Sequence, residues 1–166
     1  MEKLKLVKPN KYFEQEAKEY IKEFRDFKSH INGVGELDGY DNYDDWLKKI
    51  ENELDDSKIK PGRVKASTYF LIKEGEDKII GMINIRHELN DYLLNFGGHV
   101  GYSIRPTERR KGYATELLAL GLKECIKLGI KKVLLTCDKE NMGSSKTIIN
   151  NGGILENEVQ DEDRIT

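Results

Sequence analysis

The sequence is short of cysteine and of long apolar runs. Its two cysteines, Cys125 and Cys137, stand in separate apolar segments, and neither has the neighbours expected of a metal ligand. So few cysteines in a chain without an export signal predict a reduced, cytoplasmic protein. The opening stretch MEKLKLVKPNKYFEQ has no apolar run after its lysines, so we expect neither secretion nor a membrane span.

The sequence also lacks an excess of charge of either sign. Lysine and arginine number 28 against 30 aspartates and glutamates, which predicts no nucleic-acid partner. The strings GxGxxG and GxxxxGK[ST] are absent, so the usual nucleotide-binding folds are disfavoured. At 166 residues, the chain fits one domain over 1–166 that can bury its own core.

Apolar spacing predicts a mixture of strands and helices. Residues three and four apart, such as Ala17, Tyr20, Ile21 and Phe24, predict amphipathic helices, and alternation predicts strands. We expect strands over 4–8, 68–73, 79–88, 99–105 and 131–137 and from 154, and helices over 11–28, 43–54, 114–128 and 142–151. The order βααβββαβαβ predicts an antiparallel meander and then a βαβ unit, whose two strands must pair in parallel.

The stretch RPTERRKGYATELL, Arg105 to Leu118, places four cations and a glycine where a strand gives way to a helix. Unpaired N–H groups at a helix start carry partial positive charge, so basic side chains there require an anion. Gly112 lets the backbone approach a ligand closely. We expect a diphosphate to accept from the N–H groups of Arg110, Lys111, Gly112, Tyr113, Ala114 and Thr115, while Arg109 to Lys111 neutralise its charge. The alternative is a solvated turn.

These residues resemble the phosphate-binding signature R-x-x-G-x-A/G of the GNAT acyltransferases, which stands here as Arg109 to Ala114. The preceding IRP tripeptide fits, and NMGSSKTIINNGG resembles the N-x-x-S/A helix of the same family. The resemblance covers nearly the whole chain. It implies an α/β (α+β) fold with a mixed, mostly antiparallel sheet, helices on both faces, and a parallel pair that splays at the cofactor site.

The resemblance also implies an activity, which is transfer of an acetyl group from acetyl-CoA to a primary amine of a small molecule, peptide or protein. The amine would attack directly, without a metal or a covalent intermediate. The pantetheine arm would pair with strand backbone near Ile104, and Asn141 and Ser144 would face the cofactor.

The residues leave the proton transfers open. His99 and Glu88 are the candidates for the base, because both are expected near the cofactor-flanking strand and His99 titrates near neutrality. The alternative for His99 is a structural role, as a strand histidine whose ring nitrogens are already hydrogen-bonded. Family members carry a tyrosine seven residues after the asparagine as the acid, whereas this chain has Ile148 there. Tyr102 or Tyr113 could substitute, or the thiolate could leave unaided.

Two features leave further alternatives. With Ile148 in the place of the tyrosine, and the chain stopping at Thr166 where the family has a last strand, a non-catalytic acyl-CoA sensor is the second hypothesis. In the family this strand closes one wall of the acceptor pocket. Here that wall would be absent, truncated or supplied by a partner, so a homodimer remains an alternative. The acidic stretch between Val34 and Ser57 is either a solvated helical face or a rim that attracts a cationic amine. Its aromatics Tyr40, Tyr43 and Trp46 are either core or pocket lining.

Overall fold

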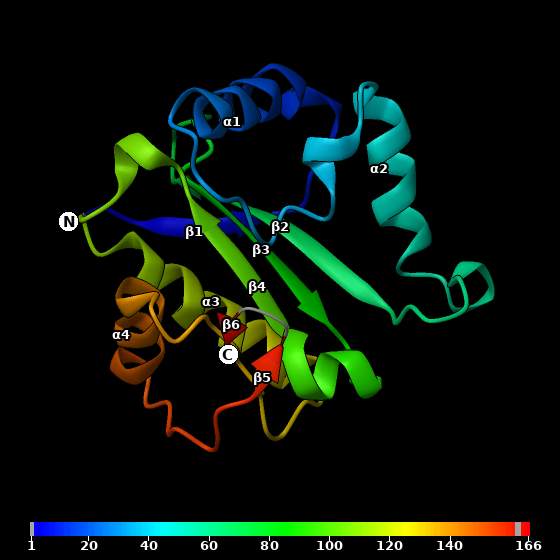
Figure 1. The fold of residues 1–166 in the computed structure, drawn as a ribbon. Coiled ribbons are helices and arrows are strands. Elements are labelled where there is room, and N and C mark those ends of the chain that lie inside the picture. Colours follow the sequence, from blue (N-terminus) through cyan, green and yellow to red (C-terminus); the bar gives the residue numbers. More distant parts are fainter. Residues whose placement is uncertain (1, 162–163) are drawn as a thin grey trace.

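The computed structural model describes residues 2–161 and 164–166. A four-stranded antiparallel sheet crosses the molecule in the order β1-β2-β3-β4, so sequence neighbours are also neighbours in the sheet (Figure 1). The strands are β1 (Leu4–Val7), β2 (Ala66–Lys73), β3 (Gly81–Arg86) and β4 (Val100–Ile104). Strand β4 is therefore an edge strand, and its outer edge is available to other groups.

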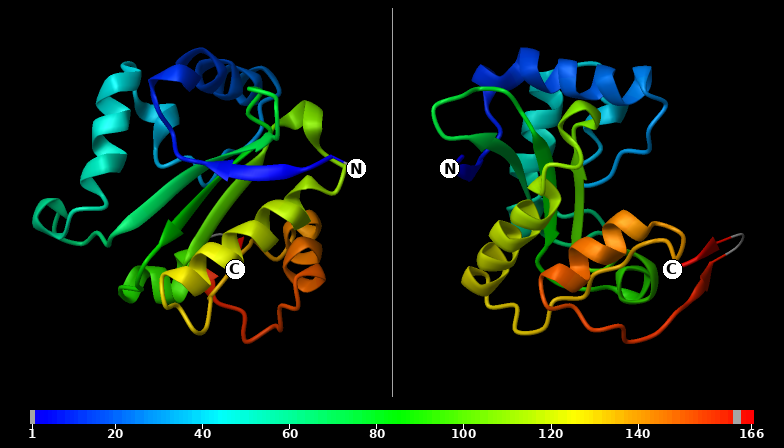
Figure 2. Two further views of the ribbon diagram at one scale, coloured as in Figure 1. Left: turned by 180° about the vertical axis from the view of Figure 1, so that it is seen from behind. Right: turned by 90° about the vertical axis from the view of Figure 1, so that its left-hand side faces the viewer.

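Helices cover both faces of this sheet. They are α1 (Glu14–Asp26), α2 (Tyr43–Asn52), α3 (Tyr113–Lys127) and α4 (Met142–Asn150). Helices α1 and α2 lie over one face, and α3 and α4 lie over the other, as the views in Figures 1 and 2 agree. The expected mixed α/β fold with helices on both faces is confirmed. None of the described helices is both long and apolar enough to cross a lipid bilayer.

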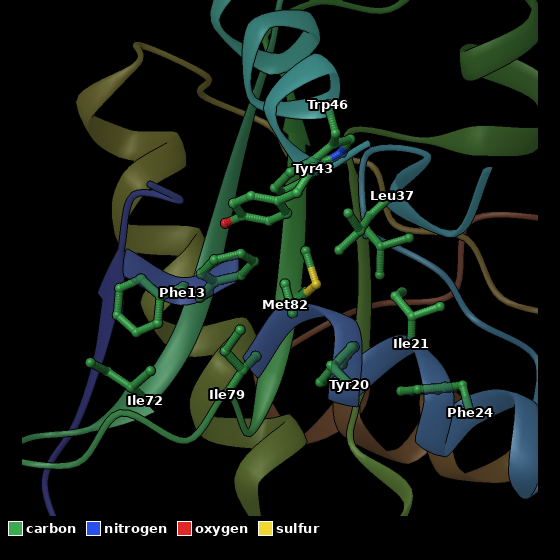
Figure 3. Close-up of a cluster of buried hydrophobic side chains, with 13 residues drawn as sticks. Phe13, Tyr20, Ile21, Phe24, Leu37, Tyr43, Trp46, Ile72, Ile79 and Met82 are labelled. Atoms are coloured by element: carbon green, nitrogen blue, oxygen red, sulfur yellow. The ribbon is translucent and has the colours of Figure 1, made fainter. Parts of the chain in front are cut away.

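Two buried cores follow from the alternation of side chains along the strands. Phe70 and Ile72 of β2 point to the α1 and α2 side, whereas Leu71 between them points to the α3 side, as the period of two requires. Figure 3 shows the first core, in which Trp46 and Tyr43 are buried among apolar side chains. The core interpretation of these two aromatics is therefore confirmed. Tyr40 is half-buried and packs against the same cluster.

Local signals in the sequence set the helix ends. Asn42 caps α2, because its side chain accepts a hydrogen bond from the Asp45 N–H, and Asn141 caps α4 in the same way through the Ser144 N–H. Helix α3 begins after Gly112, which has a left-handed backbone, and it ends before Gly129. The expected helix boundaries hold to within a few residues.

The expected parallel strand over 131–137 is wrong. Among the described residues, one backbone hydrogen bond joins this segment to the start of β4: the His99 N–H donates to the Leu134 carbonyl, at 2.8 Å. The Leu134 N–H donates to a side chain instead, His99 Nδ1, at 3.0 Å, and Thr136 Oγ1 donates to the Phe96 carbonyl at 2.9 Å. The His99 side chain thus occupies the Leu134 N–H, which a strand ladder beside β4 would need.

The prediction of a final strand from residue 154 is also wrong. Ile154 is 91% exposed and lies outside any strand. The described strands in this region are β5 (Gln160–Asp161) and β6 (Arg164–Ile165), which pair only with each other in a separate two-stranded sheet. Without an apolar face turned to the core, residues 154–158 gain too little from joining the main sheet.

Candidate functional site

A cavity of about 1020 Å³ runs along strand β4. One wall comes from the loop that follows α1, and the other from the N-terminal ends of α3 and α4. Its two ends differ in chemistry. One end holds the backbone turn around Gly112, and the other holds Arg86 and the segment that contains Tyr92 and Phe96.

The turn before α3 presents a set of unpaired backbone N–H groups. Gly112 has φ 82° and Arg110 has φ 62°, so two left-handed residues turn the chain immediately before the helix. The first turn of α3 has no side-chain cap, and the Glu116 N–H donates to the carbonyl of Gly112, the residue before the helix. The N–H groups of Tyr113, Ala114 and Thr115 therefore have no acceptor within the helix. Successive N–H groups in such a turn form an anion-binding concavity.

The cations beside this turn have different surroundings. Arg109 is exposed, but its guanidinium has partners: its Nε donates to the Ile104 carbonyl at 3.2 Å, its Nη2 donates to Ser29 Oγ at 2.8 Å, and it lies 5.4 Å from the centre of the Phe24 ring. Lys111 Nζ lies 2.8 Å from Glu108 Oε2. Arg110 is exposed and has no partner among the described side chains, so it is the most available of the three to a bound phosphate.

The outer edge of β4 offers backbone groups along the cavity. Arg86 N–H donates to the His99 carbonyl and Arg105 N–H to the Ile80 carbonyl, so alternate residues of β4 bond to β3. The intervening residues Val100, Tyr102 and Ile104 turn their N–H and carbonyl groups to the open edge. The Ile104 carbonyl already accepts from Arg109, whereas its N–H and the groups of Val100 and Tyr102 remain for a ligand amide.

Tyr102 and Ser144 meet inside the cavity. The Tyr102 hydroxyl and Ser144 Oγ share a hydrogen bond of 2.8 Å, and both residues line the cavity. Burial raises the pKa of Tyr102 although the bond to Ser144 opposes that change. The phenol therefore keeps its proton at neutral pH. Asn141, the cap of α4, also lines the cavity. Sequence analysis placed Asn141 and Ser144 here, and the structure brings both to the wall opposite β4.

The second tyrosine considered as an acid is engaged elsewhere. Tyr113 is buried, and its hydroxyl donates to Glu2 Oε2 at 2.5 Å. Lys73 Nζ lies 5.7 Å from the centre of its ring. Its side chain thus ties α3 to the N-terminal segment and β2, while its backbone N–H belongs to the turn.

The two candidate bases lie outside the cavity lining. His99 is 7% exposed, and its Nδ1 accepts a hydrogen bond from the Leu134 N–H, so this nitrogen carries no proton in that bond. Burial and the neighbouring Arg86 lower the pKa of His99. Glu88 is exposed on the bend that follows β3, because the strand ends at Arg86. This geometry favours the structural role for His99.

The acidic stretch is largely compensated by neighbouring cations. Arg63 lies 2.7 Å from Glu36, Lys11 lies 2.9 Å from Asp44, and Lys65 pairs with Asp56 at 3.3 Å. Such exposed pairs are typical of a solvated surface. The structure therefore favours the solvated face over a rim that attracts cations.

Two features of the site were not predicted from the sequence. Gly33 packs so closely on β4 that a Cβ atom there would lie 2.3 Å from the Gly101 carbonyl oxygen, and its φ is 69°. Arg86, which lines the cavity, looked like an ordinary residue at a strand end. Neither has a local signal in the sequence, because each depends on a segment distant in the chain. Within the described residues, no group of three or more His, Cys, Asp or Glu side chains could hold a metal ion.

The chain also matches a known protein family. A family model described as the Acetyltransferase (GNAT) family matches residues 15–147. No curated protein matches the sequence significantly.

Several solved structures share the fold at low sequence identity. A Vibrio cholerae protein assigned provisionally as a ribosomal-protein-serine acetyltransferase is 16% identical, with a TM-score of 0.63 over 96% of this chain and 85% of that one. The microcin C7 self-immunity acetyltransferase MccE, solved with acetyl-CoA and AMP, is 18% identical, with a TM-score of 0.62 over 98% and 89%. A GNAT-family acetyltransferase from Staphylococcus aureus Mu50 is 16% identical, with a TM-score of 0.56 over 98% and 96%.

Proposed function

The chain belongs to the GNAT acetyltransferase family, and from this premise we propose that it transfers an acetyl group from acetyl-CoA to a primary amine by direct attack. One observation supports the cofactor site above all. The N–H groups around Gly112 are unpaired and open onto a cavity that continues along the free edge of β4. A diphosphate fits the turn, and an amide-bearing arm fits the strand edge. The similar structure of MccE was solved with acetyl-CoA, which supports this assignment.

In the proposed reaction, the amine nitrogen forms a bond to the thioester carbonyl carbon, and the carbon–sulfur bond then breaks. The amine loses one proton and the departing thiolate gains one, so the net products are an amide and free CoA. The protein's part is to hold the two reactants in line and to exclude water. Backbone donors on the open edge of β4, such as the Tyr102 N–H, are placed to stabilise the developing oxyanion.

Tyr102 is our proposal for the proton donor. Its hydroxyl lies in the cavity and bonds Ser144, whereas the Tyr113 hydroxyl is bound to Glu2. The raised pKa of Tyr102 keeps the donor protonated at neutral pH. Ile148, which stands where the family tyrosine would be, packs against the α3 core and offers no proton. A donor from β4 would therefore replace the missing one.

For the base, we propose that water takes the proton from the substrate ammonium, which gives the neutral amine that then attacks. His99 and Glu88, the candidates from the sequence, are not part of the cavity lining. An exposed amine has a pKa of about 10, so the fraction that is neutral at pH 7 is small and the rate should rise with pH. We also propose a cytoplasmic location, which the two free cysteines support.

The test is acceptor-dependent release of free thiol. The protein is mixed with acetyl-CoA and a broad panel of primary amines, and free thiol is followed with time. Release that requires both an amine and the protein supports the transferase. CoA binding without release across the panel would instead favour the alternative, a sensor of acyl-CoA, to which the apolar Ile148 points.

A further inference from the structure

Arg86 at the end of β3 is a half-buried cation without a counterion. Its Nη1 donates to the carbonyl oxygens of Gly97 and Gly98, at 3.2 and 3.4 Å. Among the side chains that the structure describes, no carboxylate forms an ion pair with it, and Nε and Nη2 have no hydrogen-bond partner. Two of its nitrogen atoms thus keep donors for a ligand.

Another arginine in the same sheet shows how unusual this is. Arg105, which directly follows β4, is 7% exposed and so is buried more completely than the half-buried Arg86, and it pairs with Glu16 at 3.1 Å and Glu23 at 2.5 Å. Removing a charge from water costs free energy unless an opposite charge or hydrogen bonds compensate it. The carboxylate near Arg86 is Glu53, and that group already lies 2.9 Å from Lys49 Nζ. Burial accordingly lowers the pKa of Arg86.

The surroundings of Arg86 leave room for a ligand. It lines both the cavity along β4 and a neighbouring hollow between the loop after α1 and the start of β2. A Cβ atom at Gly101 would lie 3.4 Å from Arg86 Nη2, so the absence of a side chain there keeps this nitrogen uncovered. Gly33 packs against the backbone of Gly101, and its Cα and N lie 3.4 Å from the position that a Gly101 Cβ would take.

The position of Arg86 along the sheet separates it from the phosphate-binding turn. Ile85 pairs with Val100 at one end of β4, and Gly81 pairs with Ile104 at the end that leads to the turn. Strands rise about 3.3 Å per residue, so the two ends are separated by roughly 13 Å. A cofactor whose diphosphate is held at Gly112 would place its acyl end along β4, toward Arg86. The cation therefore belongs to the acceptor side.

We propose that the acceptor is a small primary amine that also carries an oxyanion, a carboxylate or a phosphate, and that Arg86 binds this group. The inference rests on the proposed function, since it names the substrate class of the same site. Arginine suits the role because its planar fork donates two parallel hydrogen bonds to such an oxyanion. Fixing the anion would orient the amine nitrogen toward the thioester.

The experiment compares matched amines that differ in the anion alone. One pair is β-alanine and β-alaninamide, and the other is phosphoethanolamine and ethanolamine. kcat/KM is measured for each with the wild-type chain, Arg86→Gln, Arg86→Lys, and Arg25→Gln as the control, since Arg25 lies on α1 outside both hollows. Calorimetry with CoA and a thermal unfolding curve accompany every variant.

We expect the wild type to prefer at least one anionic amine over its partner by about tenfold or more in kcat/KM. Arg86→Gln should abolish that preference, Arg86→Lys should retain part of it, and Arg25→Gln should keep it. The pair that shows the preference distinguishes carboxylate from phosphate. Equal values within both pairs for the wild type, or a preference that survives in Arg86→Gln, would overturn the proposal.

Two further readouts separate this proposal from the proposed function. If Arg86→Gln weakens CoA binding tenfold and acts equally on both members of a pair, Arg86 serves the cofactor and the proposal is wrong. If no amine releases thiol, the transferase fails, and the CoA-bound wild type is titrated with the same pairs. Tighter binding of the anionic member would then uphold the anion site alone. If Arg86→Gln does not fold, the wild-type pairs and Arg86→Lys decide.

Discussion

The Tyr102 hydroxyl lies 2.8 Å from Ser144 Oγ and so links strand β4 to helix α4 across 42 residues of sequence. A second tyrosine and serine meet on the opposite face of the same strand, where the Tyr20 hydroxyl lies 2.8 Å from Ser103 Oγ. The two pairs have the same chemistry, but only the first stands at the wall between β4 and α4 that the thioester would approach.

Tyr102→Phe should therefore lower kcat by about tenfold to a hundredfold, because it removes the proposed proton donor while keeping the ring. Tyr20→Phe is the matched control: we expect it to cost about 1 kcal/mol of stability through its lost hydrogen bond and to leave kcat within twofold. Steady-state kinetics and urea unfolding on both variants measure this. Similar kcat values for the two variants would remove Tyr102 from the mechanism.

His99→Asn and Glu88→Gln should leave the shape of the pH–rate profile unchanged. The His99 Nδ1 accepts from the Leu134 N–H, and an asparagine oxygen can take over that bond, whereas Glu88 is exposed outside the cavity. Profiles of kcat/KM between pH 6 and about 10 cover the expected titration of the amine. A limb of the profile that disappears in either variant would identify that residue as the base.

Gly112→Leu should weaken CoA binding by about tenfold or more, since a side chain would stand where the diphosphate meets the N–H groups. Gly129→Leu is matched to it, because both glycines flank α3, both have φ near 80°, and a Cβ atom at either meets nothing within 4 Å. Each change should cost roughly 1–2 kcal/mol of stability for the left-handed backbone. Calorimetry then shows whether CoA affinity falls in the Gly112 variant alone; equal affinities would displace the cofactor from this turn.

Glu23→Gln should destabilise the fold by about 3 kcal/mol, because it leaves the buried Arg105 with one carboxylate fewer. Glu23 Oε2 accepts from Arg105 Nε at 2.5 Å, and its Oε1 accepts from the Thr107 N–H at 2.8 Å. Burial opposes the charge, yet the bonds from Thr107 and Arg105 hold the pKa of Glu23 below its ordinary value. The exposed Glu19, on the same helix, provides the control Glu19→Gln, which urea unfolding should show to be near neutral.

Glu108 should make stability depend on pH in the acid range. Hydrogen bonds from Lys111 and Lys78 lower its pKa from 4.5 to about 2. A carboxyl group whose pKa is lower in the folded than in the unfolded state stabilises the fold at any pH above its unfolded-state pKa. That stabilisation is lost as the pH falls from about 4.5 to about 2. At pH 7, Glu108→Gln should be less stable than the wild type by about 1 kcal/mol, since both lysines are half-exposed.

The same comparison at pH 3 should give a smaller difference between Glu108→Gln and the wild type. Urea unfolding at the two pH values measures it. A difference of equal size at pH 7 and pH 3 would mean that the ionised carboxylate contributes nothing and that only the shape of the side chain matters.

The sequence by itself determined the local elements and the turn at Gly112 that we propose for phosphate binding. Apolar spacing located α1, α2, α3 and the meander, because a side-chain period belongs to each segment alone. Asn42 and Asn141 marked helix starts, and Gly112 marked the turn, because capping and a left-handed backbone involve only a few neighbouring residues. The family was also evident at this level, since its signature is contiguous.

Tertiary structure alone decided which groups are satisfied and which remain available to a ligand. Arg109 and Arg110 are neighbours in the sequence and both are exposed, yet Arg109 hydrogen-bonds Ile104 and Ser29, while Arg110 has no partner among the described side chains. Residues 131–137 have the composition of a strand, but His99 takes the Leu134 N–H. Arg86 forms no ion pair among the described side chains, whereas Arg105 pairs with Glu16 and Glu23. Each outcome depends on the distance between segments far apart in the chain, which no local pattern of residues encodes.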